Sequence, residues 1–344
     1  MNNPLVSVIL PCYNASLYVE EALHSVINQT YKNLEILAID DGSSDDTLEI
    51  LKKLSFKDKR IKIIRNESNL GLIKSLNKAI LLAKGDFVAR MDADDISHLS
   101  RFSKQVDFLN RHHEIDIISS SSSSIDVEGN VFGLPFMVLT SKSAVKFMSL
   151  IRNPMVHGSI MSRRSVFKNQ QYSNLPKAIY TEDYELWMRL FKDNCQFANI
   201  NEVLYYYRKN PKGVSAQNSK LQFTNSLSNS IAYASEYLNQ SIPISTYQLA
   251  TNKIIYPYTF VDIWKANRLL NNMLKIFRKK ECVKKNELEE IYVFLNRQKI
   301  DFLGQVIIKG HLLKKLSAFV LILLNPVLFL DKNNITYILS KRSK

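Results

Sequence analysis

The sequence predicts an α/β protein with a mostly parallel sheet that binds its ligand along one edge. Strand-like and helix-like patterns alternate between residues 5 and 90, as they do in βαβ units. Polar loops follow three of the expected strands, at the ends where ligands bind in such sheets. The last of these loops, Arg90–Asp95, holds three carboxylates within four positions. Like charges this close repel, so the loop requires a positive partner.

Each expected element has its own pattern. Short runs of β-branched and apolar residues indicate buried strands, and apolar residues at helical spacing indicate helices. The expected strands are residues 5–10, 34–39, 61–65 and 85–89. The expected helices are residues 16–29 with Ser16 as the cap, then 45–54 and 71–83.

The loops that follow three of these strands are Pro11–Asn14, Asp40–Ser43 and Asp92–Asp95. Because parallel strands end at one edge of a sheet, the topology predicts that the three loops meet there. Carboxylate oxygens favour hard cations such as Mg²⁺ or Mn²⁺, and a metal at this edge would hold nucleotide phosphates. The alternative is an acidic loop that caps a helix beginning near Ser97.

Between residues 115 and 130 the sequence predicts a strand and a turn. The serine run Ser119–Ser124 is interpreted as the end of a strand, since Ile125 and Val127 continue its apolar pattern. Asp126–Asn130 is interpreted as a hairpin turn.

Two later segments carry candidate functional groups. His157 precedes an expected strand at residues 159–162, so it is either a core histidine or a ligand at the same sheet. Thr181 is expected to cap a helix whose first turn contains Glu182 and Asp183. These two acids either stabilise that helix terminus or take part in the chemistry.

The last expected strand is residues 203–207, and a basic loop follows at residues 208–215. The flanking Pro and Gly predict a mobile loop, which is either an ordinary surface loop or a cover for a diphosphate. The sequence contains neither Gly-x-Gly-x-x-Gly nor Gly-x-x-x-x-Gly-Lys-Ser/Thr, which argues against a dinucleotide-binding fold and a P-loop protein.

Length and charge predict two regions. A chain of 344 residues corresponds to two domains at about 150 residues each, and the composition shift places the boundary near residue 220, giving domains 1–220 and 221–344. Of the net charge of +14, residues 251–344 contribute +11, from 18 Lys and Arg against 7 Asp and Glu. This asymmetry predicts an anionic partner, either nucleic acid or a membrane surface, or else a solvated basic face.

Residues 316–330 form an uncharged, mostly apolar run that contains a proline. The run is shorter than the roughly 20 residues of a spanning helix, so it is either an interfacial membrane segment or a buried helix. The N-terminus has no charged region before a long apolar run, so no signal peptide is expected. Three widely separated cysteines show no zinc or disulfide pattern, which predicts a cytoplasmic location.

Five motifs, in order, resemble the glycosyltransferases of family 2, which have the GT-A fold with a Rossmann-like sheet and helices on both faces. The resemblance covers residues 5 to about 215 and is closest to bacterial enzymes of O-antigen or capsule assembly. The matching motifs are Val8–Asn14, Ile39–Asp45, Asn69–Gly71, Arg90–Asp95 and Glu182–Trp187.

The resemblance implies roles for individual residues. Those implied to bind the nucleotide sugar are Pro11, Tyr13, Asp41, Asp92 and Arg208. Asp94 would bind Mn²⁺ or Mg²⁺, and Asp183 would be the general base. Relatives often have a His shortly after the residue that matches Arg208, whereas this chain has Lys209 and Asn210. His157 is the possible substitute as a metal ligand.

The activity implied is inverting transfer of a hexose, Gal or Glc, from a UDP-sugar to GlcNAc-diphospho-undecaprenol, forming a β-linkage in O-antigen and lipopolysaccharide biosynthesis. The enzyme would lie on the inner face of the bacterial cell membrane as a peripheral protein and would not bind nucleic acid. The alternatives are a transferase for capsule or another glycan, a nucleotide-sugar nucleotidyltransferase, which normally needs a Gly-rich phosphate loop, and a nucleic-acid-binding protein that uses the basic C-terminus.

Overall fold

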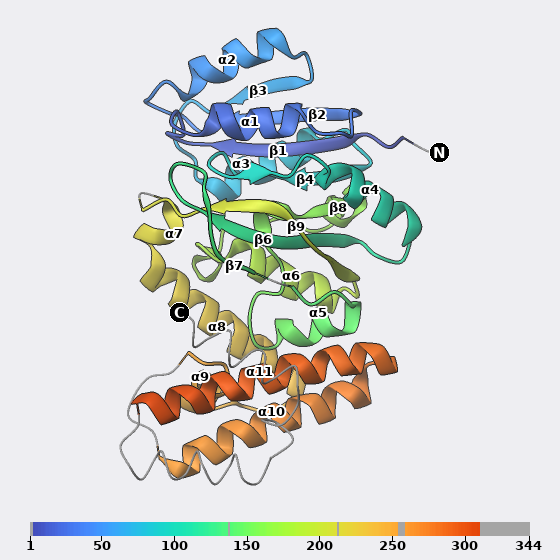
Figure 1. Ribbon diagram of the computed structural model, residues 1–344, viewed down its shortest axis with the longest axis vertical. Helices are drawn as coiled ribbons and strands as arrows, with labels where there is room; N and C mark the ends of the chain where they lie inside the picture. Colours follow the sequence, from blue (N-terminus) through green and yellow to red (C-terminus); the bar gives the residue numbers. More distant parts are fainter. Residues whose placement is uncertain (1–2, 137, 212, 254–258, 310–344) are drawn as a thin grey trace. The chain divides into compact units, whose positions relative to one another are not determined.

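The computed structural model describes residues 3–136, 138–211, 213–253 and 259–309 (Figure 1). The chain divides into two compact units. The first comprises Met1–Val145 and Asn153–Ser226, and the second comprises Lys146–Arg152 and Leu227–Lys344. The boundary predicted near residue 220 lies within helix α8 (Ser219–Leu238). The apolar run at residues 316–330 lies outside the described residues.

The first unit is built on one mixed sheet. Its strands, in spatial order, are β3 (Ile61–Arg65), β2 (Leu34–Asp40), β1 (Val6–Cys12), β4 (Phe87–Arg90), β8 (Met161–Arg163), β6 (Ile117–Ile125), β9 (Phe197–Arg208) and β5 (Ile96–Ser97). Strands β3, β2, β1 and β4 are parallel to one another, and β6 and β9 are parallel to each other. Strand β8 runs antiparallel between β4 and β6, and β7 (Val131–Phe136) pairs antiparallel with β6.

Helices cover both faces of the parallel half of this sheet (Figure 1). They are α1 (Val19–Ile27), α2 (Thr47–Lys57), α3 (Leu72–Leu82) and α4 (Arg101–Arg111). The same unit also contains α6 (Glu182–Lys192), α7 (Val214–Gln217), the first half of α5 (Lys142–Ser149) and the short 3-10 helices His157–Ser159, Arg164–Lys168 and Pro176–Ala178.

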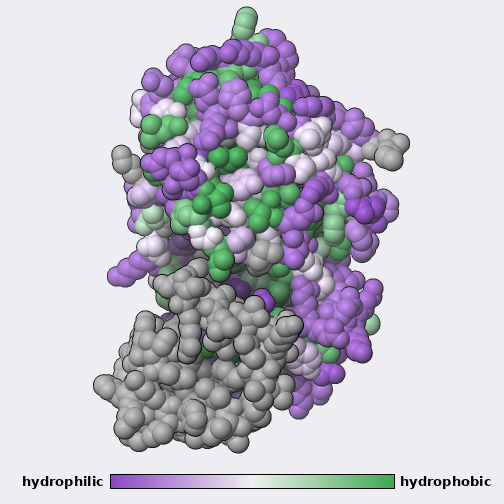
Figure 2. All heavy atoms as spheres, viewed as in Figure 1, coloured by the Kyte–Doolittle hydropathy of each residue, from purple (hydrophilic) through white to green (hydrophobic). Residues whose placement is uncertain are grey.

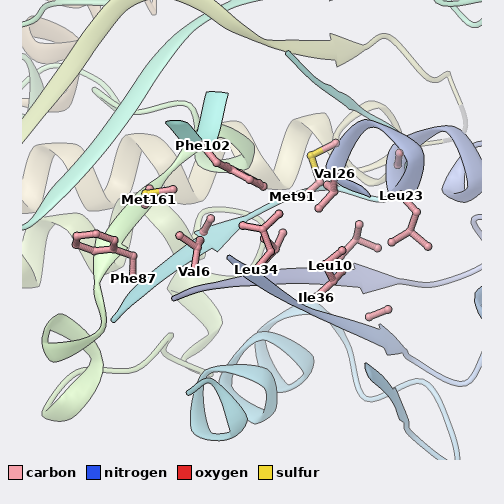
Figure 3. Packing of buried hydrophobic residues seen from close by; sticks show 14 of the residues in the cluster. Val6, Leu10, Leu23, Val26, Leu34, Ile36, Phe87, Met91, Phe102 and Met161 are labelled. Atoms are coloured by element: carbon pink, nitrogen blue, oxygen red, sulfur yellow. The ribbon is translucent and has the colours of Figure 1, made fainter. Parts of the chain in front are cut away.

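One face of the sheet packs against α1, α2 and α4 (Figure 3). Alternate residues of a strand point to the same face, so Val6 and Leu10 of β1 meet Leu23 of α1 and Phe102 of α4 in one buried cluster. Met91, directly after β4, belongs to this cluster and is fully buried. The core therefore fixes the backbone at the start of the acidic loop.

The second unit is helical in its described part. Its elements are the second half of α5, the end of α8, then α9 (Ile244–Ala250), α10 (Phe260–Lys280) and α11 (Lys285–Lys309). Phe147 contacts Phe277 and Phe294 at ring-centroid distances of 5.2 and 6.5 Å. None of the described helices is both long enough and apolar enough to cross a membrane.

Most predicted elements of the first unit are confirmed, including the strand formed by the serine run and the hairpin turn that follows it. Two helix starts are wrong. Helix α1 begins at Val19 with Tyr18 as its N-cap residue, so Ser16 does not cap it, and the Ser16 amide donates to Asp45 Oδ2 (3.0 Å). Ser97 lies in strand β5, and the next helix begins at Arg101.

Hydrophobic side chains reach the surface of the first unit among hydrophilic ones (Figure 2). All six residues of β7 are exposed, although five of them are apolar or proline. This strand is the second strand of the hairpin that it forms with β6.

Candidate functional site

The predicted meeting of three loops at one edge of the sheet is confirmed by the strand order, since β2, β1 and β4 are adjacent and parallel. Hydrogen bonds join the first two loops. The Asn14 amide donates to Ser43 Oγ (3.1 Å), and the Ser44 amide donates to Asn14 Oδ1 (2.9 Å). Tyr13, in the first loop, is 50% exposed and is available to a ligand. Pro11 lies in β1, opposite Ile39 of β2.

Asp41 connects the second loop to the Asn69–Gly71 motif. Its Oδ1 accepts hydrogen bonds from Asn66 Nδ2 (2.8 Å) and the Leu70 amide (2.9 Å), and its Oδ2 accepts one from the Gly71 amide (2.9 Å). A carboxylate has about four acceptor positions, so Oδ2 retains capacity for a further donor. The carboxylate is held in a fixed orientation by these three bonds.

The acidic loop alternates between core and site. Met91 and Ala93 are buried in the hydrophobic cluster, whereas Asp92 and Asp94 stay partly exposed. Arg90 Nη1 donates to Asp92 Oδ2 at 2.5 Å, and this guanidinium is nearly buried. The positive partner that the charge pattern requires is therefore Arg90, the last residue of β4, directly before the loop.

Burial and neighbouring charge change the protonation of this loop. Burial, followed by the Asp92 charge, raises the pKa of Asp94 to about 6. Burial raises the pKa of Asp95 well above its usual value, with Asp92 and Asp94 adding to the effect. A bound cation would favour the ionised form of Asp94. The donor set of the loop is carboxylate oxygen, which suits Mn²⁺ or Mg²⁺.

Tyr205 of β9 contacts two carboxylates of the acidic loop and was not predicted from the sequence as a site residue. Its hydroxyl donates to Asp95 Oδ2 (2.6 Å) and lies 3.2 Å from Asp92 Oδ2. Gly158 makes room for it, since a Cβ there would be 2.0 Å from the tyrosine hydroxyl oxygen and 2.8 Å from Asp92 Oδ2. Tyr205 occurs in a run of three tyrosines, and it is the one of the three that the fold buries completely.

Replacing Gly158 by Ala is expected to lower the free energy of unfolding by about 1–3 kcal/mol, because the new methyl group overlaps a fully buried tyrosine. Chemical denaturation measures this loss. Gly213→Ala is the control, since its Cβ would come no closer than 3.1 Å to another atom and its φ is negative. Equal stability of the two variants would show that Tyr205 moves aside at little cost.

Arg208 is the last residue of β9 and is buried, so the predicted mobile loop begins after it. Its Nε donates to the Asp94 carbonyl (2.7 Å), and its backbone amide donates to Asp95 Oδ1 (2.7 Å). Its Nη1 donates to the carbonyls of Asp126 and Val127, and its Nη2 donates to Glu21 of α1 (2.5 Å). The guanidinium thus ties the acidic loop to α1 and to the β6–β7 hairpin.

Glu182 and Asp183 begin helix α6 as predicted, but the Thr181 side chain does not cap it and instead donates to the Lys177 carbonyl. Asp183 accepts hydrogen bonds from Asn153 Nδ2 (2.6 Å) and the Tyr184 amide (2.7 Å). Burial raises the pKa of Asp183. Burial and the Asp183 charge raise the pKa of Glu182 to about 7. Both carboxyls therefore stay protonated to a higher pH than exposed carboxyls do.

His157 lies beside this carboxyl pair. Its Nε2 is 2.8 Å from the Tyr172 hydroxyl, and its Nδ1 is 3.9 Å from Glu182 Oε1. Burial, followed by the charge of Arg90, lowers the pKa of His157 well below its usual value, so the ring is neutral. Within the described ranges, no group of three or more His, Cys, Asp and Glu side chains is arranged to hold a metal ion.

Comparison with known proteins identifies relatives. The family model described as Glycosyl transferase family 2 matches residues 7–170. The putative glycosyltransferase EpsE of Bacillus subtilis (strain 168) is 30% identical over 276 residues, which cover 78% of this chain and 96% of EpsE. The Escherichia coli protein WfaP, named UDP-Glc:alpha-D-GlcNAc-diphosphoundecaprenol beta-1,3-glucosyltransferase, is 32% identical over 218 residues, or 63% of this chain and 82% of WfaP.

Among solved structures, S. aureus TarS 1-349 in complex with UDP-GlcNAc is similar to this chain with a TM-score of 0.55. The sequences are 21% identical, and the match covers 86% of this chain and 81% of the TarS chain. This likeness supports the same fold. The match to EpsE covers nearly all of that protein, and the family model, the sheet and its acidic loop agree with it. We conclude that the chain belongs to glycosyltransferase family 2 and is a glycosyltransferase with the GT-A fold.

Proposed function

We propose that the enzyme transfers a hexose, glucose or galactose, from a UDP-sugar to a GlcNAc-diphospho-undecaprenol acceptor in O-antigen assembly. The observation that carries this proposal is the similarity to WfaP, whose name specifies UDP-Glc and this lipid acceptor. Glucose is therefore the first donor to test. The same chemistry would serve a capsule or another lipid-linked glycan.

For the donor, we assign the uracil and ribose to the edge formed by Pro11, Tyr13, Asp41 and Asp92. The free acceptor position on Asp41 Oδ2 suits the N–H of the base, and the half-exposed Tyr13 ring suits stacking on it. Arg208, predicted from the resemblance to bind the nucleotide sugar, has its guanidinium bonded within the protein. We therefore propose that it acts on the donor by holding the acidic loop.

We assign a divalent metal, Mn²⁺ or Mg²⁺, to Asp94, with His157 as the second candidate ligand. Two features support Asp94. Its ligand atoms are carboxylate oxygens, and a nearby cation would keep this carboxylate ionised although burial raises its pKa. His157 is neutral, as a ligand must be, but both of its nitrogens face other side chains. When bound, the metal would neutralise charge on the departing UDP.

For catalysis, we assign the general base to Asp183. A base near the acceptor hydroxyl removes its proton as the oxygen attacks the anomeric carbon. Attack on the face opposite the leaving UDP inverts the configuration, so an α-linked UDP-sugar gives a β-linked product. Asn153 and the Tyr184 amide hold the Asp183 carboxylate in place for this step.

The turnover number kcat should rise with pH, with a midpoint above the range of an ordinary aspartate, because the base acts only when ionised and burial raises the pKa of Asp183. Raised pKa values favour the protonated form, so activity is lost on the acid side. Glu182→Gln removes a neighbouring negative charge and should shift the midpoint to lower pH. A profile of kcat against pH for both proteins measures the shift. Identical midpoints would show that the Glu182 charge does not influence the pKa of the base.

For its location, we propose that the enzyme binds the cytoplasmic face of the cell membrane as a peripheral protein and does not bind nucleic acid. The basic second region and a lipid-linked acceptor support this placement.

The test is a transfer assay with purified protein, Mn²⁺, a panel of UDP-sugars and GlcNAc-diphosphate-lipid, followed by mass spectrometry. The expected result is one added hexose with a single preferred donor. UDP binding without product from any donor would reject this acceptor while leaving the glycosyltransferase assignment intact.

A further inference from the structure

Helix α10 has one buried face and one exposed face. The buried residues, which include Ile263, Leu270 and Phe277, recur at helical spacing. The exposed residues of interest lie on the opposite side and are named here the basic stripe. They are Val261, Trp264, Lys265, Arg268, Lys275, Arg278 and Lys279.

The basic stripe holds five cations and no acid. The single acidic residue of the helix, Asp262, forms a capping box with Thr259 and so serves the helix N-terminus. Arg268 lies over the ring of Trp264, 5.1 Å from its centroid. The other four cations have no hydrogen-bond, ion-pair or ring partner among the residues described. Unpaired cations in a row repel one another and favour an anionic partner.

The apolar end of the stripe indicates which anionic partner fits. Val261 and Trp264 are 52% and 45% exposed. Tryptophan favours the boundary between lipid headgroups and hydrocarbon. A nucleic acid would satisfy the cations and could stack a base on Trp264, but it would offer no hydrocarbon phase to Val261. A helix of 21 residues is about 31 Å long, so a flat surface meets the whole stripe at once.

We propose that α10 docks along an anionic lipid surface through the basic stripe, with Trp264 and Val261 entering the interface. This inference rests on the proposed function, because a lipid-linked acceptor gives the transferase a reason to stay at the membrane. The docking face is thus assigned to a helix of the described chain and is independent of the apolar run at residues 316–330.

The experiment is flotation of the full-length protein with vesicles of phosphatidylcholine alone and of phosphatidylcholine with phosphatidylglycerol. The wild-type protein should bind the mixed vesicles, and added salt should weaken binding. The triple variant Lys265→Gln, Arg268→Gln, Lys275→Gln should bind about a hundredfold more weakly, since each cation at an anionic surface contributes about 1 kcal/mol. Trp264→Ala should weaken binding separately from the charge.

The matched control is Lys57→Gln, Lys84→Gln, Lys168→Gln, which removes three exposed cations from the first unit and changes the net charge equally. It should bind vesicles like the wild type. Equal binding by the stripe variant and the control would overturn the proposal, as would wild-type binding to RNA but not to mixed vesicles.

Transfer to a soluble GlcNAc-diphosphate with a short alkyl chain separates this inference from the proposed function. The stripe variant should transfer sugar to the soluble acceptor at the wild-type rate and lose activity only on vesicle-embedded acceptor. Absence of transfer by the wild type to either acceptor would reject the proposed acceptor, and the vesicle-binding result would still decide the docking face.

Discussion

Asp183→Asn is expected to lower kcat by about 10²–10⁴-fold while leaving UDP affinity unchanged. The amide cannot accept the acceptor proton, but it retains the shape of the side chain. Its one carbonyl oxygen can replace Oδ2, which accepts from Asn153, or Oδ1, which accepts from the Tyr184 amide. Steady-state transfer assays give kcat, and isothermal titration with UDP gives affinity. The separation of the two quantities is the signature of a base that acts in the chemical step.

Glu185→Gln is the matched control for this prediction. Glu185 lies on the same helix and pairs with Arg189 at 2.9 Å, so its loss should affect stability more than kcat. Turnover near the wild-type value for Asp183→Asn would instead give the base role to Glu182 or Glu185.

Asp94→Asn is expected to weaken metal-dependent binding of the UDP-sugar by more than about a hundredfold. Loss of residues that merely support a metal ligand typically costs 10–100-fold, and loss of a ligand should cost more. Titration of the UDP-sugar with and without Mn²⁺ measures the metal-dependent part. In the absence of metal, the variant and the wild type should bind similarly.

Asp107→Asn controls for the removal of a carboxylate elsewhere, since Asp107 is exposed on α4 and pairs with Arg111 there. It should bind the UDP-sugar like the wild type. Unchanged metal-dependent binding by Asp94→Asn would remove Asp94 as a ligand.

The parallel half of the fold could be predicted because its information is local. Each strand from β1 to β4 has its own apolar run, and the intervening helices have helical periodicity. The other half depends on distant pairings. Strand β9 begins at Phe197, six residues before the prediction, because polar residues such as Asn199 lie buried against β6 and hide the strand pattern.

The charged part of the site could be predicted from the sequence. Neutral residues whose role depends on their place in the fold could not. The charge of the Arg90–Asp95 loop required a cation, and Arg90 supplies one. Tyr205 and Gly158 give no such signal, since the importance of each depends on how close the other lies. Arg208 was expected in a loop because Pro and Gly follow it, whereas its backbone pairs with Ile125 of β6 and so belongs to the strand.

The anomeric configuration of the product tests the central claim most directly. The wild-type enzyme would be incubated with Mn²⁺, UDP-glucose and GlcNAc-diphosphate-lipid, and the new glycosidic bond would be examined by NMR. Single displacement with Asp183 as the base predicts a β-linked hexose on GlcNAc. An α-linked product would contradict the account, because retention of configuration requires a different arrangement of catalytic groups from the one proposed here.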